Sequence, residues 1–162
     1  MEPPPPSAAA GVKARVLDIP LYGIGFEFVE ITPQKVTGRL PVTEKCCQPF
    51  KVLHGGVSAM ISEALASMGA HMASGFQRVA GVHLGIHHLK SAHLGDLVFA
   101  EAAPINVGKS IQVWEVCLWK TDPSDEENKT LLASSRVTLK VGMSVPQNAT
   151  DAAVNLKKYA KL

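Results

Sequence analysis

A single carboxylate within an apolar segment is the feature of this chain that most suggests chemistry. Glu63 lies in a run of apolar and small residues that extends from about 55 to 72. Glutamate is almost never fully buried unless it is paired or functional, and an ionised carboxylate in apolar surroundings must shift its pKa or find partners. Glu63 is therefore the strongest candidate for a functional group. The alternative is a structural carboxylate paired with His54, His71 or an arginine.

Two glycines open the same segment, directly after a histidine. His54-Gly55-Gly56 stands where the predicted helix begins. The free backbone N–H groups at a helix N-terminus carry partial positive charge. Because glycine lets a ligand approach the backbone closely, a carbonyl oxygen placed there would be polarised and a developing oxyanion stabilised. The alternative is that the two glycines only form a tight turn.

The spacing of these groups indicates that they do not act on one atom within a single chain. Gly55 and Glu63 are separated by about 12 Å along a helix, at 1.5 Å per residue. Two subunits packed antiparallel would bring Gly55 of one chain to Glu63 of the other. Ser67, one turn beyond Glu63 on the same face of the helix, could orient the carboxylate or a water molecule.

The segments around this helix alternate apolar and polar residues, as strands do. Residues 25–31 and 35–42 flank the turn signal Thr32-Pro33-Gln34 and predict a hairpin. Four further runs predict a meander, with a charged, exposed loop at 122–128. These four runs are 79–88, 97–107, 110–120 and 131–141.

The order of two strands, one buried helix and four strands predicts an α+β fold. A helix that is apolar on all sides is a buried helix. A curved antiparallel sheet of about six strands wrapped around the long central helix would bury it, and this architecture is the hotdog fold. A single such layer leaves sheet edges and one helix end uncovered, which favours at least a dimer.

Composition restricts the classes of protein to which the chain can belong. Its 162 residues correspond to one domain, and its net charge of +2 comes from scattered basic residues without a nucleic-acid-binding patch. No apolar run is long enough to span a bilayer. The three cysteines show neither a CxxC motif nor zinc-ligand spacing with the histidines, which indicates free thiols in a reducing compartment. Cys47 is a conceivable nucleophile, but a buried inert thiol is the simpler interpretation.

The two ends differ from the central domain, which we place at 16–145. Residues 1–15 begin with a proline-rich run that cannot form helix or sheet, and we expect a disordered leader there. Residues 146–162 predict a tail helix over 148–159, followed by Ala160-Lys161-Leu162. This tripeptide is a conservative variant of the Ser-Lys-Leu peroxisomal address, so we expect a peroxisomal protein that binds the import receptor.

Short polar insertions interrupt the otherwise apolar strands. Lysine, arginine and small hydroxyl residues suit phosphate oxygens, although each insertion can equally be a solvated strand end. The insertions are Lys90, Gly108-Lys109-Ser110 and Ser134-Ser135-Arg136.

Together these motifs resemble those of the hotdog-fold acyl-CoA thioesterases, in the branch typified by the Arthrobacter-type 4-hydroxybenzoyl-CoA thioesterase. The resemblance covers about residues 21–142 and is closest to the plant 1,4-dihydroxy-2-naphthoyl-CoA thioesterases of phylloquinone synthesis, which end in the same kind of tripeptide. One departure is His87, where relatives often have asparagine. The shared positions are Gln48, His54-Gly55-Gly56, Glu63, Ser67, His88-Leu89-Lys90-Ser91 and Ser134-Ser135-Arg136, with the runs 46–56 and 111–116.

The resemblance implies a catalytic role for five residues. Glu63 would be the catalytic carboxylate, acting as nucleophile or as general base on water. Gly55 would donate its backbone N–H to the thioester oxygen, and Ser67 would position the water. His54 and Gln48 would help to hold the thioester. No metal or separate cofactor is implied, because CoA is part of the substrate.

The resemblance also implies binding residues and an assembly. The aromatic acyl group would contact His88, Phe50 and Met68. The protein would be a tetramer, built as a dimer of dimers with sites at the dimer interface, and neither nucleic acid nor membrane is expected as a partner. The CoA moiety would be bound by Lys90, Gly108, Lys109, Ser110, Ser134, Ser135 and Arg136.

Other functions remain open from the residues alone. A hotdog hydratase would use His with Asp or Glu to move water across a C=C bond, but Glu63 followed by Ser67 favours thioester hydrolysis. A non-catalytic acyl-CoA-binding module would need no carboxylate at the thioester. The residues do not distinguish a dihydroxynaphthoyl group from another aryl or fatty acyl group.

Overall fold

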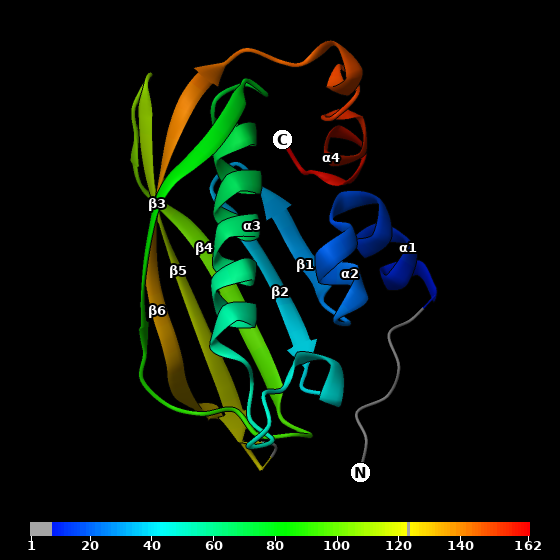
Figure 1. Ribbon diagram of the computed structural model, residues 1–162, viewed down its shortest axis with the longest axis vertical. Helices are drawn as coiled ribbons and strands as arrows, with labels where there is room; N and C mark the ends of the chain where they lie inside the picture. Colours follow the sequence, from blue (N-terminus) through cyan, green and yellow to red (C-terminus); the bar gives the residue numbers. More distant parts are fainter. Residues whose placement is uncertain (1–7, 123) are drawn as a thin grey trace.

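A six-stranded antiparallel sheet curves around one long helix, which confirms the predicted α+β hotdog architecture (Figure 1). The computed structural model describes residues 8–122 and 124–162. Helix α3 (Gly55–Ala73) lies across one face of the sheet. In spatial order the strands are β1 (Glu27–Thr32), β2 (Lys35–Pro41), β4 (Leu97–Val107), β5 (Ile111–Asp122), β6 (Asp125–Met143) and β3 (Arg78–His88).

The strand order differs from the predicted four-strand meander. β3 pairs with β6 at one edge of the sheet, whereas β4 pairs with β2 and β5. After β3 the chain passes the start of α3, where the Leu53 N–H donates to the Ala92 carbonyl at 2.8 Å, before β4 begins. Residue alternation reports which face a side chain occupies but not which strand is its partner. The meander prediction was therefore wrong for β3.

The turn between β5 and β6 is shorter than predicted. Asp122 pairs with Asp125, so most of the segment predicted as an exposed loop at 122–128 is strand. The Asp122 carboxylate accepts a hydrogen bond from the Ser124 N–H at 2.9 Å. An aspartate that bonds the backbone two residues further on can close a tight turn by itself, so no longer loop is needed.

Helix α3 is tied to the inner face of the sheet by apolar packing and by one buried amide. Trp114 of β5 is fully buried, and its indole N–H donates to Gln112 Oε1 at 2.8 Å. Gln112 Nε2 in turn donates to the Ala70 carbonyl of α3 at 3.2 Å. Because both polar groups of Gln112 have partners, this side chain is buried at little cost and connects the sheet to the helix.

Only one side of α3 is enclosed. Ile61, Leu65 and Ala66 are fully buried against the sheet. Ala64 and Met68 on the other side are half-buried, and so is Glu63, which lies between the two sides beside edge strand β3. That second side faces the two N-terminal helices and the C-terminal segment, which cover it partly (Figure 1). The expectation that the helix is buried all round was therefore wrong, because the sheet covers a single side.

The N-terminal segment is helical where a disordered leader is expected. Helix α1 (Ala8–Leu17) and the short α2 (Ile19–Gly23) precede β1. Ala14 is fully buried, so this part of the predicted leader packs on the core. The alanine-rich residues after the proline run favour helix, which explains the difference. Residues 1–7 lie outside the described residues, and the leader prediction stays untested there.

The C-terminal tail forms two short elements in place of the predicted continuous helix over 148–159. These are the 3₁₀ turn η2 (Gln147–Ala149) and helix α4 (Val154–Tyr159). Leu156 is buried, Asn155 Nδ2 donates to the Val16 carbonyl at 3.3 Å, and the Lys161 N–H donates to the Ile31 carbonyl at 2.9 Å. A helix of this length is not stable alone, so these contacts hold the tail against α1 and β1.

Candidate active site

The Glu63 carboxylate lies directly over the backbone of Gly81 in β3. A Cβ built at position 81 would lie 2.8 Å from Glu63 Cδ and 3.0 Å from Oε2, closer than real Cβ contacts. Gly81 pairs with Leu139 on the face of the sheet toward α3. A glycine inside a strand often marks a close approach of another group, and this signal in the sequence could have identified Gly81.

Glu63 is not held by a counter-charge. Among the described residues the structure gives its carboxylate neither an ion pair nor a hydrogen bond. His71, one of the expected partners, instead contacts the Gln77 carbonyl through Nδ1 at 2.6 Å. His54 is bonded to the backbone of Gly56. The alternative of a structural carboxylate paired with a histidine or an arginine is therefore not supported.

The start of α3 has the geometry expected of a carbonyl-polarising site. His54 is the N-cap, and its Nδ1 accepts a hydrogen bond from the Gly56 N–H at 2.9 Å. Among the described residues the Gly55 N–H has no hydrogen-bond partner. A Cβ at Gly55 would lie 3.2 Å from both Cε1 and Nε2 of His88, so the imidazole lies against this glycine. A ligand oxygen at Gly55 would thus meet a free N–H beside a histidine.

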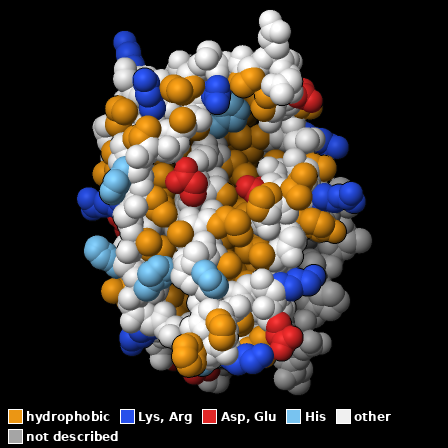
Figure 2. All heavy atoms as spheres, viewed as in Figure 1, with side chains coloured by type: hydrophobic (Ala, Val, Ile, Leu, Met, Phe, Trp, Pro, Cys, Tyr) orange, Lys and Arg blue, Asp and Glu red, His pale blue; other side chains and the backbone are white. Residues whose placement is uncertain are grey.

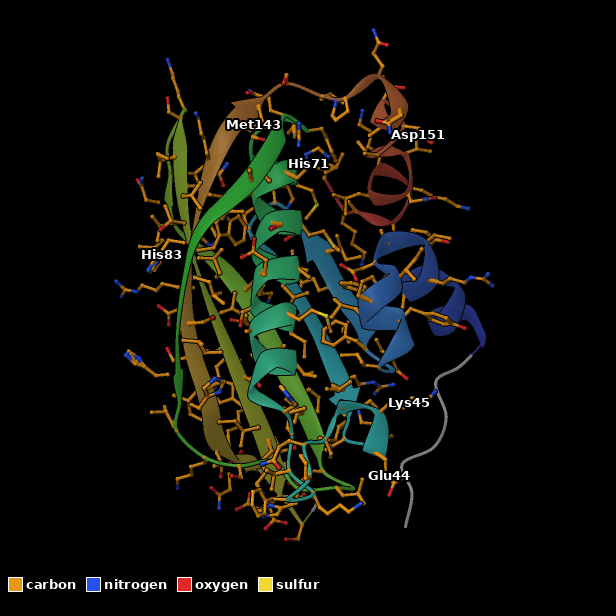
Figure 3. All side chains as sticks on the ribbon, viewed as in Figure 1. Glu44, Lys45, His71, His83, Met143 and Asp151 are labelled. Atoms are coloured by element: carbon orange, nitrogen blue, oxygen red, sulfur yellow. The ribbon has the colours of Figure 1, made fainter. Side chains whose placement is uncertain are left out.

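The strand register separates the two adjacent histidines of β3. His88 pairs with the buried Ala133 and faces α3, whereas His87 pairs with Ser134 on the outer face. His83 also lies on the outer face, opposite Thr138, and Figure 3 shows it on the side of the sheet away from α3. The prediction that only one of His87 and His88 can face a site inside the fold is correct.

A small cavity of about 250 Å³ collects several predicted site residues at this end of the molecule. It is lined by Gln48, Gly55, His88 and Lys90, together with apolar residues. The Gln48 side-chain oxygen accepts a hydrogen bond from the Phe50 N–H, and the Phe50 side chain is 86% exposed. Phe50 therefore contacts no acyl pocket within its own chain.

A larger hollow of about 690 Å³ lies along the open side of α3. Glu63, Ser67 and Met68 line it, facing residues of α1, α2 and the tail. Figure 2 shows this hollow on the front of the molecule, with mainly hydrophobic side chains and acidic groups at its centre. Because Gly55 lines the small cavity and Glu63 lines the hollow, one chain does not bring the two groups to a common point.

The predicted CoA-binding residues fall into separate groups. Lys90 follows β3 near the start of α3, whereas Lys109 and Ser110 lie in the β4–β5 turn at the opposite end of the sheet. The Ser110 carbonyl accepts from the Val141 N–H at 2.8 Å, and Gly108 donates to the Ile111 carbonyl at 2.9 Å, which fixes this turn. One CoA molecule cannot contact both ends of a single chain through these residues.

The two serines before Arg136 point to opposite faces. Ser134 and Arg136 lie on the outer face, where Arg136 is exposed. Ser135 is buried on the inner face, and its hydroxyl donates to the Val116 carbonyl at 3.0 Å. Because this hydroxyl is buried and already bonded, the assignment of Ser135 to CoA binding is corrected to a structural role.

The cysteines have the properties of inert thiols. Cys46 is buried, and Cys46, Cys47 and Cys117 are all free thiols. Partial burial, aided by the neighbouring Cys46, raises the pKa of the Cys47 thiol, and burial also raises the pKa of Cys117. The thiolate is the nucleophilic form, so these shifts argue against Cys47 as a nucleophile.

The part of the chain that the structure describes has neither a metal-binding cluster nor a membrane-spanning helix. It contains no group of three or more His, Cys, Asp or Glu side chains arranged to hold a metal ion. No helix in these residues is long and apolar enough to cross a bilayer. The arrangement is thus a carboxylate beside an apolar hollow and, in a separate small cavity, a helix N-terminus with a free N–H.

Comparison with known proteins places this arrangement in a family. The sequence pattern of the thioesterase superfamily matches residues 50–127. The 1,4-dihydroxy-2-naphthoyl-CoA thioesterase 2 of Arabidopsis thaliana is 58% identical over 144 residues, which are 88% of this chain and 92% of the relative. A 1,4-dihydroxy-2-naphthoyl-CoA hydrolase of Listeria monocytogenes is 41% identical over 73% of this chain and 91% of its own.

A solved structure agrees with the sequence relatives. The crystal structure of a thioesterase from Haemophilus influenzae superposes with a TM-score of 0.63 and 32% identity, and covers 75% of this chain and 81% of that protein. The chain therefore belongs to the thioesterase superfamily of hotdog proteins.

Proposed function

We propose that this protein hydrolyses an aromatic acyl-CoA thioester, with 1,4-dihydroxy-2-naphthoyl-CoA as its substrate and 1,4-dihydroxy-2-naphthoate and CoA as products. The observation that carries the proposal is the Glu63 carboxylate, which is held over Gly81 without a counter-charge and opens into an apolar hollow. The substrate is taken from relatives in Arabidopsis thaliana and Listeria monocytogenes that bear this name. In such an enzyme the product would enter phylloquinone synthesis.

A dimer would bring the separated groups together. β3 is an edge strand that pairs only with β6 among the described strands. On this strand, Gly81 lies beneath Glu63 of α3. His88, further along the same strand, lies against Gly55 at the start of α3. A two-fold axis near the middle of β3, with β3 paired antiparallel to its copy, would bring the Gly81 end of one chain to the His88 end of the other. Glu63 would then face Gly55 of the partner.

The chemistry needs only these two groups. The Gly55 N–H would donate to the thioester oxygen and stabilise the oxyanion that develops on attack. Glu63 would either attack the carbonyl carbon, to give an anhydride that water then opens, or remove a proton from a water that attacks directly. In both routes the C–S bond breaks and CoA leaves as thiolate. In the anhydride route water then cleaves one C–O bond of the anhydride, which releases the carboxylate product and regenerates Glu63; in the direct route the acyl carbon gains the water oxygen. Ser67, one turn from Glu63, would position that water.

The remaining predicted residues would bind the substrate around this centre. Gln48 and His54 would hold the thioester, and His88 lies where it would border the carbonyl at Gly55. Met68 lines the hollow and would contact the acyl group. Because the Phe50 side chain is exposed on its own chain, it would contact the acyl group of a substrate bound by the partner subunit. Exposed Lys90, Lys109, Ser110 and Arg136 would contact CoA phosphates from different subunits, which fits a tetramer built as a dimer of dimers.

The decisive experiment is a substrate panel with free-thiol release as the readout. Dihydroxynaphthoyl, hydroxybenzoyl and fatty acyl-CoA would be assayed together with an enoyl-CoA. We expect the dihydroxynaphthoyl thioester to give the highest kcat/KM. Hydration of the enoyl-CoA without thiol release would indicate a hydratase, and binding without turnover would indicate an acyl-CoA-binding module.

We also propose a peroxisomal location, with Ala160-Lys161-Leu162 as the segment that the import receptor reads. Leu162 is 77% exposed and Lys161 is exposed, so their side chains are accessible to a receptor. The Lys161 N–H bond to Ile31 would have to open when the tripeptide is bound as an extended peptide.

A further inference from the structure

The hollow beside Glu63 has a second carboxylate on its opposite wall. Asp18 joins α1 to α2 and lines the same 690 Å³ hollow as Glu63, Ser67 and Met68. Its neighbours on that wall are apolar: Val16, Leu17, Pro20 and Leu156. Figure 2 shows this hollow as a mainly hydrophobic surface in which acidic groups stand out.

One oxygen of Asp18 is available to a ligand. Asp18 is the N-cap of α2, and its Oδ1 accepts a hydrogen bond from the Leu21 N–H at 2.9 Å. The structure shows no hydrogen-bond partner for Oδ2 among the described residues. Every buried side-chain oxygen in these residues has a partner, so the unpaired Oδ2 is not buried. Oδ2 is therefore an accessible acceptor on a residue that lines the hollow. Partial burial raises the pKa of this carboxyl, which indicates that its surroundings are already poorly hydrated.

Three other polar side chains that line the hollow already have hydrogen-bond partners. Arg78 donates through Nη1 to the Ser144 carbonyl, His71 contacts the Gln77 carbonyl, and Asn155 donates to the Val16 carbonyl. No ion pair joins Asp18 to Arg78 or to another cation in the described part of the chain. On the wall opposite Glu63, Asp18 is thus the half-buried carboxylate with an unfilled acceptor, whereas the uncharged Thr150 and Asn155, which also line the hollow, are exposed.

We infer that Asp18 is a specificity-determining residue that accepts a hydrogen bond from a ring hydroxyl of the acyl group. The inference rests on the proposed function, in which the thioester carbon lies at Glu63 and the ring extends into the hollow. In a 1,4-dihydroxy-2-naphthoyl group the 1-hydroxyl is next to the carbonyl and can bond to it internally. The 4-hydroxyl has no such internal partner, so it is the group that Asp18 would bind. A site that hydrogen-bonds a substrate hydroxyl discriminates against the analogue that lacks it.

The test compares two substrates that differ only in this hydroxyl: 1,4-dihydroxy-2-naphthoyl-CoA and 1-hydroxy-2-naphthoyl-CoA. Asp18→Asn is the informative variant, because asparagine caps a helix as well as aspartate does. With its oxygen bonded to Leu21, the asparagine would present an NH₂ donor to the hollow, so the charge-assisted bond from the ring hydroxyl to a carboxylate is replaced at most by a weaker neutral bond in the reverse direction. Asp18→Ser keeps a capping hydroxyl and removes the carboxylate. Asp151→Asn, on the exposed tail (Figure 3), is the matched control.

We expect the wild-type protein to prefer the dihydroxy substrate by roughly 10- to 100-fold in kcat/KM, the effect of one hydrogen bond to a charged group. Asp18→Ser should bring this ratio close to one, and Asp18→Asn should lower it clearly, both with an unchanged melting temperature; Asp151→Asn should keep the wild-type ratio. An unchanged ratio in Asp18→Asn, or an equal loss on both substrates, would overturn the inference and leave the proposed function intact. If the wild-type protein hydrolysed neither thioester, the proposed function would fail with it.

Discussion

Glu63 and Gly81 form a matched pair in which the absence of a side chain on the strand makes room for the carboxylate on the helix. A Cβ at position 81 would lie 2.8 Å from Glu63 Cδ. The group that would have to move is the far end of a flexible side chain, not the backbone. In the proposed mechanism Gly81 would therefore be a positioning residue, and its substitution is expected to separate catalysis from folding.

We predict that Gly81→Ala lowers kcat by roughly 10-fold or more, because the carboxylate is pushed from its position while the fold adapts. KM should change less than kcat, since Gly81 does not line either cavity. Steady-state kinetics and thermal unfolding measured together would check this. Gly85→Ala is the control, because a Cβ there meets only His83 at 3.4 Å, an ordinary contact. Equal kcat in both variants would contradict the assignment.

Replacement of Glu63 by glutamine keeps the size of the side chain and removes its charge. We expect turnover to fall by roughly 10²-fold or more, the scale of a lost nucleophile or general base. CoA binding and the melting temperature should be retained, because Glu63 has no ion pair in the described structure. Glu44→Gln, in the exposed η1 turn (Glu44–Cys46; Figure 3), is the control. Wild-type hydrolysis by Glu63→Gln would refute the mechanism.

Arg136 and its neighbour Ser135 should respond differently to alanine. Arg136 is exposed on the outer face, so Arg136→Ala should raise KM with kcat less affected, as expected when uniform binding is lost. The effect should shrink with a truncated thioester that lacks the nucleotide. Ser135→Ala should leave KM unchanged and reduce stability by about 1 kcal/mol, through loss of the bond to Val116. Equal losses with the full and the truncated substrate would count against a phosphate contact of Arg136.

Alkylation of Cys47 should require alkaline pH. The pKa of this thiol is raised, chiefly by partial burial, so the thiolate fraction at pH 7 is smaller than for an ordinary cysteine and grows only as the pH rises. Iodoacetamide labelling followed by mass spectrometry across a pH series would measure this. Hydrolysis should persist after treatment at neutral pH and in Cys47→Ser. Loss of activity in Cys47→Ser would restore the thiol as a candidate nucleophile.

The proposed location can be tested with fluorescent fusions. A fluorescent protein at the N-terminus should enter peroxisomes, whereas the same protein at the C-terminus should leave the chain in the cytosol, because the receptor reads a free Ala160-Lys161-Leu162. Removal of these three residues should also prevent import. Activity in vitro should be unchanged, since none of the three lines either cavity. Entry of the C-terminal fusion into plastids would identify a transit peptide instead.

The sequence by itself determined most of the elements and the candidate reactive groups. The apolar run at 55–72 and the alternating runs specified α3 and the strands to within a few residues, except near 122–128 and at the two ends. Periodicity depends on neighbours along the chain, so it is visible in the sequence. Glu63 and Gly55 were identifiable because a carboxylate in an apolar segment and glycines at a helix start are local features.

Only the tertiary structure decided which groups meet. It set β3 beside β6, buried Ser135 while exposing Arg136, and packed α1 and the tail so that a hollow remains beside α3. It also placed Gly81 under Glu63 and Asp18 across from it. These relationships join residues far apart in the chain, and they depend on strand partners and packing that no local pattern specifies.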